Sequence, residues 1–107
     1  MSATVTALPL PVVAEEVETF AAEEGVSPYL IPVVEMTRRL FPTVPLSVLV
    51  EDDPEIPNER YIVIEVDVTG WEADPLFAAQ QRWTTDLFAH CPATHVHFFR
   101  LGMVASS

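Results

Sequence analysis

Apolar and polar positions along the first half of the chain follow the spacing of two helices. Apolar residues recur every three or four positions over residues 13–21, with glutamates on the remaining arc, which predicts a short amphipathic helix that stops at Gly25. A second helix begins at Ser27–Pro28, or nearer Pro32, where the missing proline N–H removes an early intrahelical bond. Pro42 ends this helix.

The second half alternates between strand and helix patterns. Leu46–Glu51 and Tyr61–Val68 show apolar residues at every second position, which is the period of a strand. Asp74–Pro75 has the residue types of a helix start, and the apolar stripe that follows ends at Pro92. Thr94–Leu101 predicts the last strand.

These elements predict an α+β fold with the order α-α-β-β-α-β. We expect a two-layer domain, with the helices packed on one face of a small mixed sheet of three strands. The second strand, the third helix and the last strand form a β-α-β unit, and the first strand lies between the two strands of this unit or at the edge of the sheet. A chain of 107 residues forms one domain, 1–107, and we expect flexible tails at 1–11 and 102–107.

The charge balance excludes two classes of partner. Sixteen Asp and Glu face five Arg, no Lys is present, and the net charge is −11. A nucleic-acid-binding surface needs a basic patch to displace counterions from phosphates, and five arginines do not supply one. Anionic membrane surfaces repel such a chain for the same reason. Nucleic acid and membrane are therefore not expected as partners.

Cysteine content and hydropathy indicate the compartment. The single cysteine, Cys91, cannot form an internal disulfide, which is typical of a reduced cytoplasmic protein. No apolar run reaches the ~20 residues that span a bilayer, and the N-terminal segment lacks the basic region of a signal peptide. We expect a cytoplasmic protein.

One group of residues has the chemistry of a metal site. His95 and His97 stand two positions apart on the predicted last strand and therefore share one face of the sheet. If the apolar residues of the middle strand face the helices, Glu65 and Asp67 lie on that same open face. Imidazole and carboxylate groups bind zinc, so one reading of this cluster is a zinc site or a His/carboxylate pair for general base catalysis. The other reading is an ordinary cross-strand pairing of His with carboxylate.

Other residues have the chemistry of a protein interface. The connection between the first two strands carries Asp52, Asp53 and Glu55, which form either a solvated loop or an acidic hook for a basic partner. Trp71 has no periodic reason for burial, so it caps the core or anchors an interface. The uncovered sheet face is expected to be covered by the first helix and tail, or by a second copy in a symmetric homodimer. Its expected apolar members are Leu49, Tyr61, Val63, Phe99 and Leu101.

The middle of the chain resembles small bacterial proteins with no assigned function. The resemblance rests on Val48–Ile56 and Tyr61–Val68, with a following helix that carries an aromatic residue like Trp83 and with a final strand. It covers about residues 46–101 and contains no diagnostic motif. It implies a small α+β domain and transfers no activity or functional residue.

Two functions are compatible with these features. The first is a non-catalytic acidic interaction or regulatory protein, of which an antitoxin-like partner of a basic protein is one example. It is favoured by the size, the charge, the high apolar content and the lack of a catalytic motif. The second is a small metal-binding domain or metal-dependent enzyme that uses the His/carboxylate cluster. Nothing in the sequence favours an enzyme over the first reading.

Overall fold

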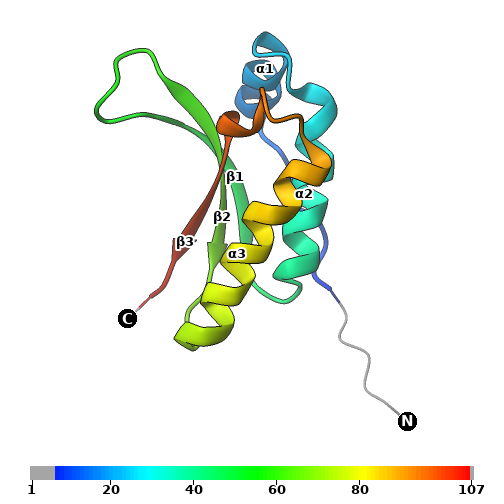
Figure 1. The fold of residues 1–107 in the computed structure, drawn as a ribbon, viewed down its shortest axis with the longest axis vertical. Coiled ribbons are helices and arrows are strands. Elements are labelled where there is room, and N and C mark those ends of the chain that lie inside the picture. Colours follow the sequence, from blue (N-terminus) through cyan, green and yellow to red (C-terminus); the bar gives the residue numbers. More distant parts are fainter. Residues whose placement is uncertain (1–6, 107) are drawn as a thin grey trace.

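Three helices pack on one face of a three-stranded mixed sheet, which is the two-layer α+β architecture predicted from the sequence (Figure 1). The structure, a computed structural model, describes residues 7–106. In chain order the elements are α1 (Glu15–Glu23), α2 (Ser27–Leu40), β1 (Leu46–Asp52), β2 (Arg60–Asp67), α3 (Ala73–His90), a 3₁₀ turn (Val96–Phe98) and β3 (Phe99–Val104).

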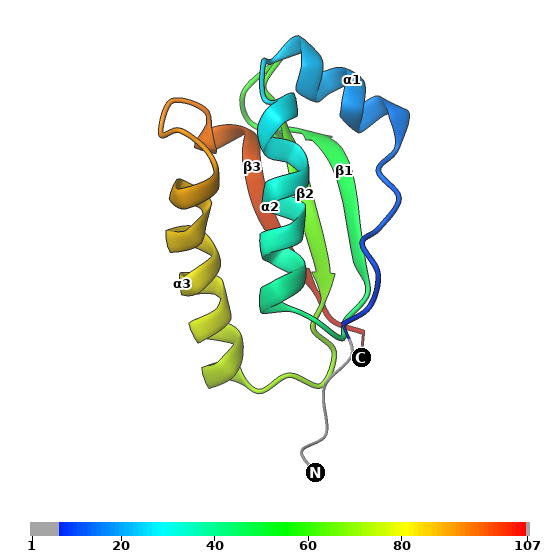
Figure 2. The same cartoon turned by 90° about the vertical axis from the view of Figure 1, so that its right-hand side faces the viewer.

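The sheet has the strand order β1-β2-β3, so the middle strand of the sequence is also the middle strand of the sheet. β1 pairs antiparallel with β2, and β3 pairs parallel with β2 through the α3 crossover. The first strand, β1, lies at the edge of the sheet, which is one of the two positions predicted for it. Figure 2 shows all three helices on the same side of the sheet.

The alternation of β2 determines what the helices cover. Ile62, Ile64 and Val66 are each 0% exposed and face the helices. The main core combines Ile62 and Ile64 with β1, the buried stripes of α1 and α2, and Trp83 of α3. A smaller cluster around Phe41, Val66 and Val68 closes the end of the domain near Trp71. The periodicity in the sequence therefore identified the buried face of β2 and the buried position of Trp83 correctly.

Helix α2 is continuous from Ser27 and contains Pro32 in its second turn. The predicted later start near Pro32 is wrong, because a proline this close to the helix N-terminus removes only one intrahelical bond. Near the other end of α2, Arg38 is buried and its guanidinium donates to the carbonyls of Phe41 and Val44. It also donates to the carbonyl of Pro9, so this part of the predicted tail 1–11 is held against α2, while residues 1–6 of that tail lie outside the described residues.

The last strand begins later than predicted. Residues 95–98 form a turn in which the N–H of Phe98 donates to the carbonyl of His95, and β3 runs from Phe99 to Val104. Phe99 is 3% exposed and faces the helices, so its predicted place on the open face is wrong. Two alternating patterns overlap here, one through Val96 and one through Phe99, and a shift of one residue exchanges the two faces of a strand. Gly102, predicted to begin a C-terminal tail, lies inside β3.

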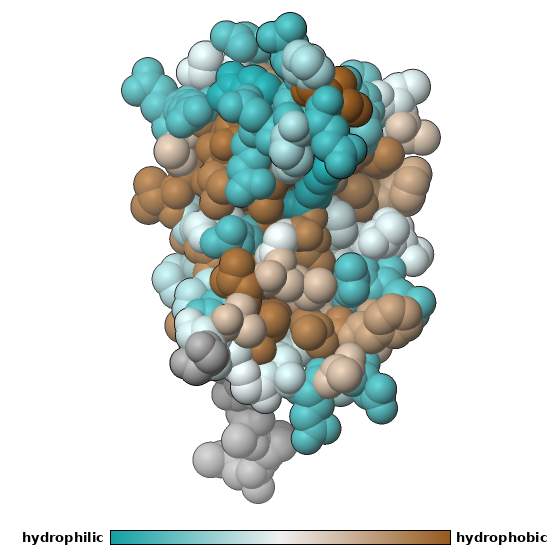
Figure 3. Space-filling view, turned by 90° about the vertical axis from the view of Figure 1, so that its left-hand side faces the viewer, coloured by the Kyte–Doolittle hydropathy of each residue, from teal (hydrophilic) through white to brown (hydrophobic). Residues whose placement is uncertain are grey.

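The face of the sheet away from the helices shows hydrophobic side chains over its middle and lower part (Figure 3). Tyr61 and Val63 point to this side, yet they are only 9% and 5% exposed. The guanidinium of Arg100 lies 3.9 Å from the centre of the Tyr61 ring. The first helix does not cover this face as expected, because α1 packs in the core on the opposite side. Hydrophilic side chains gather at the end of the face that carries the β1–β2 connection (Figure 3).

Gly102 gives Val63 the space that it occupies on this face. A Cβ atom at position 102 would lie 2.9 Å from Cγ1 of Val63, a β-branched side chain with little rotamer freedom. We expect Gly102→Ala to lower the free energy of unfolding by about 1 kcal/mol through overpacking. Urea denaturation measures this loss. In a Val63→Ala background the clash is removed, so the same Gly102→Ala change should cost nothing; an equal loss in both backgrounds would contradict the steric explanation.

Candidate functional site

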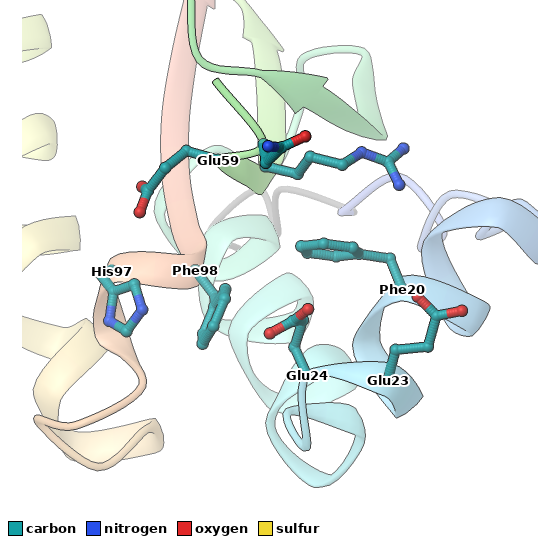
Figure 4. A pocket seen from close by; sticks show the side chains of 8 residues that line it. Phe20, Glu23, Glu24, Glu59, His97 and Phe98 are labelled. Carbon is teal, nitrogen blue, oxygen red and sulfur yellow. The ribbon is translucent and has the colours of Figure 1, made fainter. Parts of the chain in front are cut away.

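A partly enclosed hollow of polar and aromatic side chains lies where α1, the start of β2 and the turn before β3 meet (Figure 4). It has a volume of about 270 Å³. The residues that line it are Phe20, Glu23, Glu24, Asn58, Glu59, Arg60, His97 and Phe98. We call this hollow the acidic pocket.

Two phenylalanines form the apolar wall of the acidic pocket. Phe20 comes from the buried stripe of α1, and its ring meets Phe98 edge to face with centroids 6.2 Å apart. Phe98 and Phe99 are adjacent in the chain and point to different sides: Phe99 enters the core, and Phe98 stays half-buried in the pocket wall. The His97 ring lies 4.1 Å from the Phe98 ring, centre to centre. The wall is therefore aromatic over most of its length.

Three glutamates give the acidic pocket its charge. Glu23 and Glu24 lie at the C-terminal end of α1, and Glu59 precedes β2 (Figure 4). The C-terminal end of a helix is already the negative end of its dipole, and the last turn of α1 contains no basic residue. Glu23 and Glu24 therefore add negative charge where the helix itself provides no compensation.

One cation of the protein, Arg60, is itself part of the lining of this pocket. The guanidinium of Arg60 is 5.4 Å from the centre of the Phe20 ring. It also forms ion pairs at 3.2 Å with Glu16 and with Asp52. Aromatic rings attract cations through their negatively charged faces, and carboxylates attract them through their full negative charge. The guanidinium of Arg60 is held by both kinds of group. The neighbourhood of Phe20 thus has the chemistry that holds a guanidinium.

The predicted acidic hook is a structured loop next to this pocket. Oδ1 of Asp53 accepts hydrogen bonds from the backbone N–H groups of Glu55 (2.8 Å) and Ile56 (3.1 Å). These two bonds hold the pKa of the Asp53 carboxyl below its usual value, with a smaller contribution from Arg100. Asp52 pairs with Arg60, while Glu55 is exposed. Of the three carboxylates, Asp53 therefore shapes the loop and Glu55 remains available to a partner.

The residues predicted to form a metal site are not brought together. His95 and His97 lie in the turn before β3, whereas Glu65 and Asp67 lie toward the far end of β2. The prediction failed because it placed the two histidines on a strand. His95 instead lies beside the Tyr29 ring, and Nδ1 is 2.8 Å from the Thr94 hydroxyl. Within residues 7–106 no group of three or more His, Cys, Asp or Glu side chains is arranged to hold a metal ion.

Asp67 has a structural role at the end of β2. Its Oδ1 accepts hydrogen bonds from the hydroxyl (2.6 Å) and the backbone N–H (3.0 Å) of Thr69. These bonds hold the pKa of Asp67 below its usual value. Cys91 is buried at the end of α3, where burial raises the pKa of its thiol and disfavours the reactive thiolate.

The predicted interface residues are divided between two sides of the molecule. Tyr61 lies on the open sheet face under Arg100, close to the acidic loop. Trp71 packs on Phe41 with ring centres 5.2 Å apart, so it caps the end of the core, the first of its two predicted roles. Phe99 belongs to the core.

Sequence reasoning missed the residues that define the acidic pocket. One signal was present: Glu23 and Glu24 stand at a helix C-terminus, where acidic residues are unfavourable. Phe98 carried no comparable signal, because its side chain points into the pocket only if β3 begins at Phe99. The acidic pocket combines segments that are separated by more than thirty residues in the chain.

In comparisons with known proteins, no family model, no curated protein and no solved structure matches this chain. Across residues 7–106, no helix has both the length and the apolar character needed to cross a bilayer.

Proposed function

We propose that this protein is a non-catalytic interaction protein that binds a basic segment of a partner protein at the acidic pocket. The observation that carries this proposal is the combination of three glutamates with an aromatic wall in one hollow. A lysine or arginine side chain is the group that suits both features, because its charge pairs with carboxylates and its stem or guanidinium packs on aromatic rings.

The electrostatics of α1 support the same proposal. Glu23 and Glu24 add negative charge at the negative end of the helix dipole, and no basic residue of the last turn offsets it. A cation from a partner would relieve this repulsion at the moment of binding. The net charge of −11 would also speed the encounter with a basic surface and make binding sensitive to salt. An antitoxin-like role, in which a small acidic protein covers a basic one, is one form of this function.

A matched pair of charge variants tests the proposal. The triple variant Glu23→Gln, Glu24→Gln and Glu59→Gln removes the three pocket carboxylates and changes the net charge from −11 to −8. The control variant Glu18→Gln, Glu35→Gln and Glu72→Gln has the same net charge and changes exposed residues away from the pocket. The probe is a fluorescent hexa-arginine peptide, titrated by anisotropy in 50 mM salt.

We expect the pocket variant to bind the peptide at least tenfold more weakly than the unmodified protein, because three charge-assisted contacts at about 0.5–1 kcal/mol each are lost. The control should lose about threefold or less. Equal losses in the two variants would show that only the overall charge attracts the peptide, and would overturn the pocket as its site. If the pocket variant binds more weakly than the control, capture from lysate is the next step. The natural partner is expected to be a protein that the unmodified chain retains and the pocket variant does not.

A further inference from the structure

The outer face of α3 is uncharged and aromatic in a protein that is otherwise strongly acidic. Phe77 and Phe88 are 61% and 56% exposed, and they lie far from the buried side of the helix at Trp83 and Leu87. Between them lie only amide and hydroxyl side chains. The members of this face, which we call the α3 stripe, are Phe77, Gln80, Gln81, Thr84, Thr85 and Phe88.

Helical geometry places these residues on one side. Phe77 and Phe88 are eleven residues apart, which is about three turns of 3.6 residues, so their side chains point in nearly the same direction. Gln81 and Thr84 fall between them at helical spacing. The charged neighbours are off this line: Arg82 and Asp86 pair with each other at 3.0 Å along the side of the helix.

The spacing of the α3 stripe is the same when it is read in either direction. The six positions are symmetric about the point between Arg82 and Trp83. In an antiparallel pair of α3 helices centred there, Phe77 lies opposite Phe88 of the second copy. Gln81 then lies at the height of Thr84, and Gln80 at the height of Thr85. At each end of the contact an aromatic ring meets an aromatic ring, and uncharged amide and hydroxyl side chains fill the middle.

We propose that the α3 stripe binds a second copy of this chain, in a two-fold symmetric dimer with antiparallel α3 helices. Such an interface requires a surface that complements itself, since every contact from one copy to the other occurs twice. The α3 stripe meets this requirement through its symmetric spacing, and its lack of charge lets two chains of net charge −11 approach there. A basic partner would find no carboxylate among these six side chains.

The open sheet face is a weaker choice for this pairing than the sequence indicated. Tyr61 and Val63 are already covered by their neighbours, and Glu51, Glu65 and Asp67 of two copies would meet there. On α3 the carboxylate of Asp86 is paired with Arg82, and antiparallel packing keeps apart the two copies of Asp74, which lies at the N-terminal end of the helix.

The size of the contact sets the expected affinity. An 18-residue helix is about 27 Å long, and contact along one helix buries less than the ~800 Å² per partner of a standard stable interface. The dimer is therefore concentration-dependent, with a dissociation constant of roughly 10–100 µM.

Sedimentation velocity between 5 µM and 1 mM protein tests the dimer. The unmodified chain should pass from monomer to dimer over this range, and Phe77→Gln with Phe88→Gln should raise the dissociation constant at least tenfold. The control, Ile31→Gln with Ile56→Gln, removes two other exposed apolar side chains (44% and 51% exposed) and should leave the constant unchanged. A monomer at 1 mM, or an equal effect of the two variants, would overturn the proposal.

Salt separates this proposal from the proposed function. Salt weakens the attraction of a basic peptide to the acidic pocket, but it screens the repulsion between two acidic chains and should strengthen dimerisation. Dimerisation that weakens as salt rises from 50 to 500 mM would contradict a contact through an uncharged face. Each proposal can thus fail while the other holds.

Cysteine cross-linking tests the arrangement of the helices. Thr84 lies on the α3 stripe near the symmetry axis, whereas Ala78 is exposed about one turn further from that axis, where antiparallel packing keeps its two copies apart. Under mild oxidation at 200 µM, Thr84→Cys should form a disulfide-linked dimer at least tenfold faster than Ala78→Cys. Equal rates would overturn the antiparallel contact. The natural Cys91 is 2% exposed, which protects it from this reaction.

Discussion

Replacing Arg38 by methionine is expected to lower the free energy of unfolding by about 3 kcal/mol or more, because hydrogen bonds from a charged donor are worth about 1.5–3 kcal/mol each. The Arg38 guanidinium donates to the carbonyls of Phe41 (3.0 Å), Val44 (2.7 Å) and Pro9 (3.1 Å). Burial lowers the pKa of the guanidinium, which shows that its charged form is partly desolvated. The three hydrogen bonds hold the end of α2, the following loop and the N-terminal segment together.

The next residue supplies the control for this substitution. Arg39 is exposed, and its guanidinium meets only the His90 ring, at 3.4 Å, among the hydrogen bonds of the described chain. Arg39→Met should therefore change the free energy of unfolding by about 0.5 kcal/mol or less. Denaturation in guanidinium chloride measures the free energy of unfolding of both variants. Hydrogen exchange adds a local readout, since the Leu8 N–H that donates to Pro42 should lose its protection in Arg38→Met alone. Equal stability of the two variants would refute the assigned role of Arg38.

Replacing Thr37 by valine is expected to cost about 2 kcal/mol, although the two side chains have nearly the same shape. Thr37 is 0% exposed, and its hydroxyl oxygen accepts a hydrogen bond of 2.8 Å from Nε1 of Trp83 while donating to the Val33 carbonyl. Valine would leave the buried indole N–H without an acceptor, and such a group costs about 1–3 kcal/mol. Trp83→Phe removes the same donor, so the double variant should be more stable than the sum of the two single losses predicts.

Thr85 provides a matched threonine for this experiment. Its hydroxyl donates to the carbonyl four residues earlier, as that of Thr37 does, but the side chain is exposed. Thr85→Val should leave the free energy of unfolding within about 0.5 kcal/mol of the unmodified value. The measurements use 2 µM protein, below the expected range of dimer formation. A loss as large as that of Thr37→Val would show that the bond to the helix carbonyl matters, and not the bond to Trp83.

The buried faces of this fold could be predicted from the sequence because they depend on local spacing. The alternation of β2 placed Ile62, Ile64 and Val66 toward the helices. The helical spacing of the apolar residues in α3 placed Trp83 in the core. The start of β3 could not be predicted in this way, because two overlapping alternating patterns were available. Contacts of Phe99 with the core decide between them, and those contacts depend on the whole fold.

The acidic pocket was beyond sequence reasoning for a related reason. Its walls come from α1, the start of β2 and the turn before β3, and only the three-dimensional packing brings these segments together. The predicted metal site failed on the same element, since His95 and His97 were assigned to a strand that begins after them. In contrast, the acidic loop was visible in the composition alone.

The place of β2 in the sheet has a consequence for how the protein folds during synthesis. The ribosome makes β3 after all the other elements, yet β3 supplies the parallel neighbour of the central strand. Until residue 104 has left the exit tunnel, β2 presents an unpaired edge beside one of the most apolar segments of the chain. Parallel pairing across a helix also has a high contact order, which slows the final step. The nascent chain is therefore most exposed to aggregation after α3 has emerged and before β3 has paired with β2.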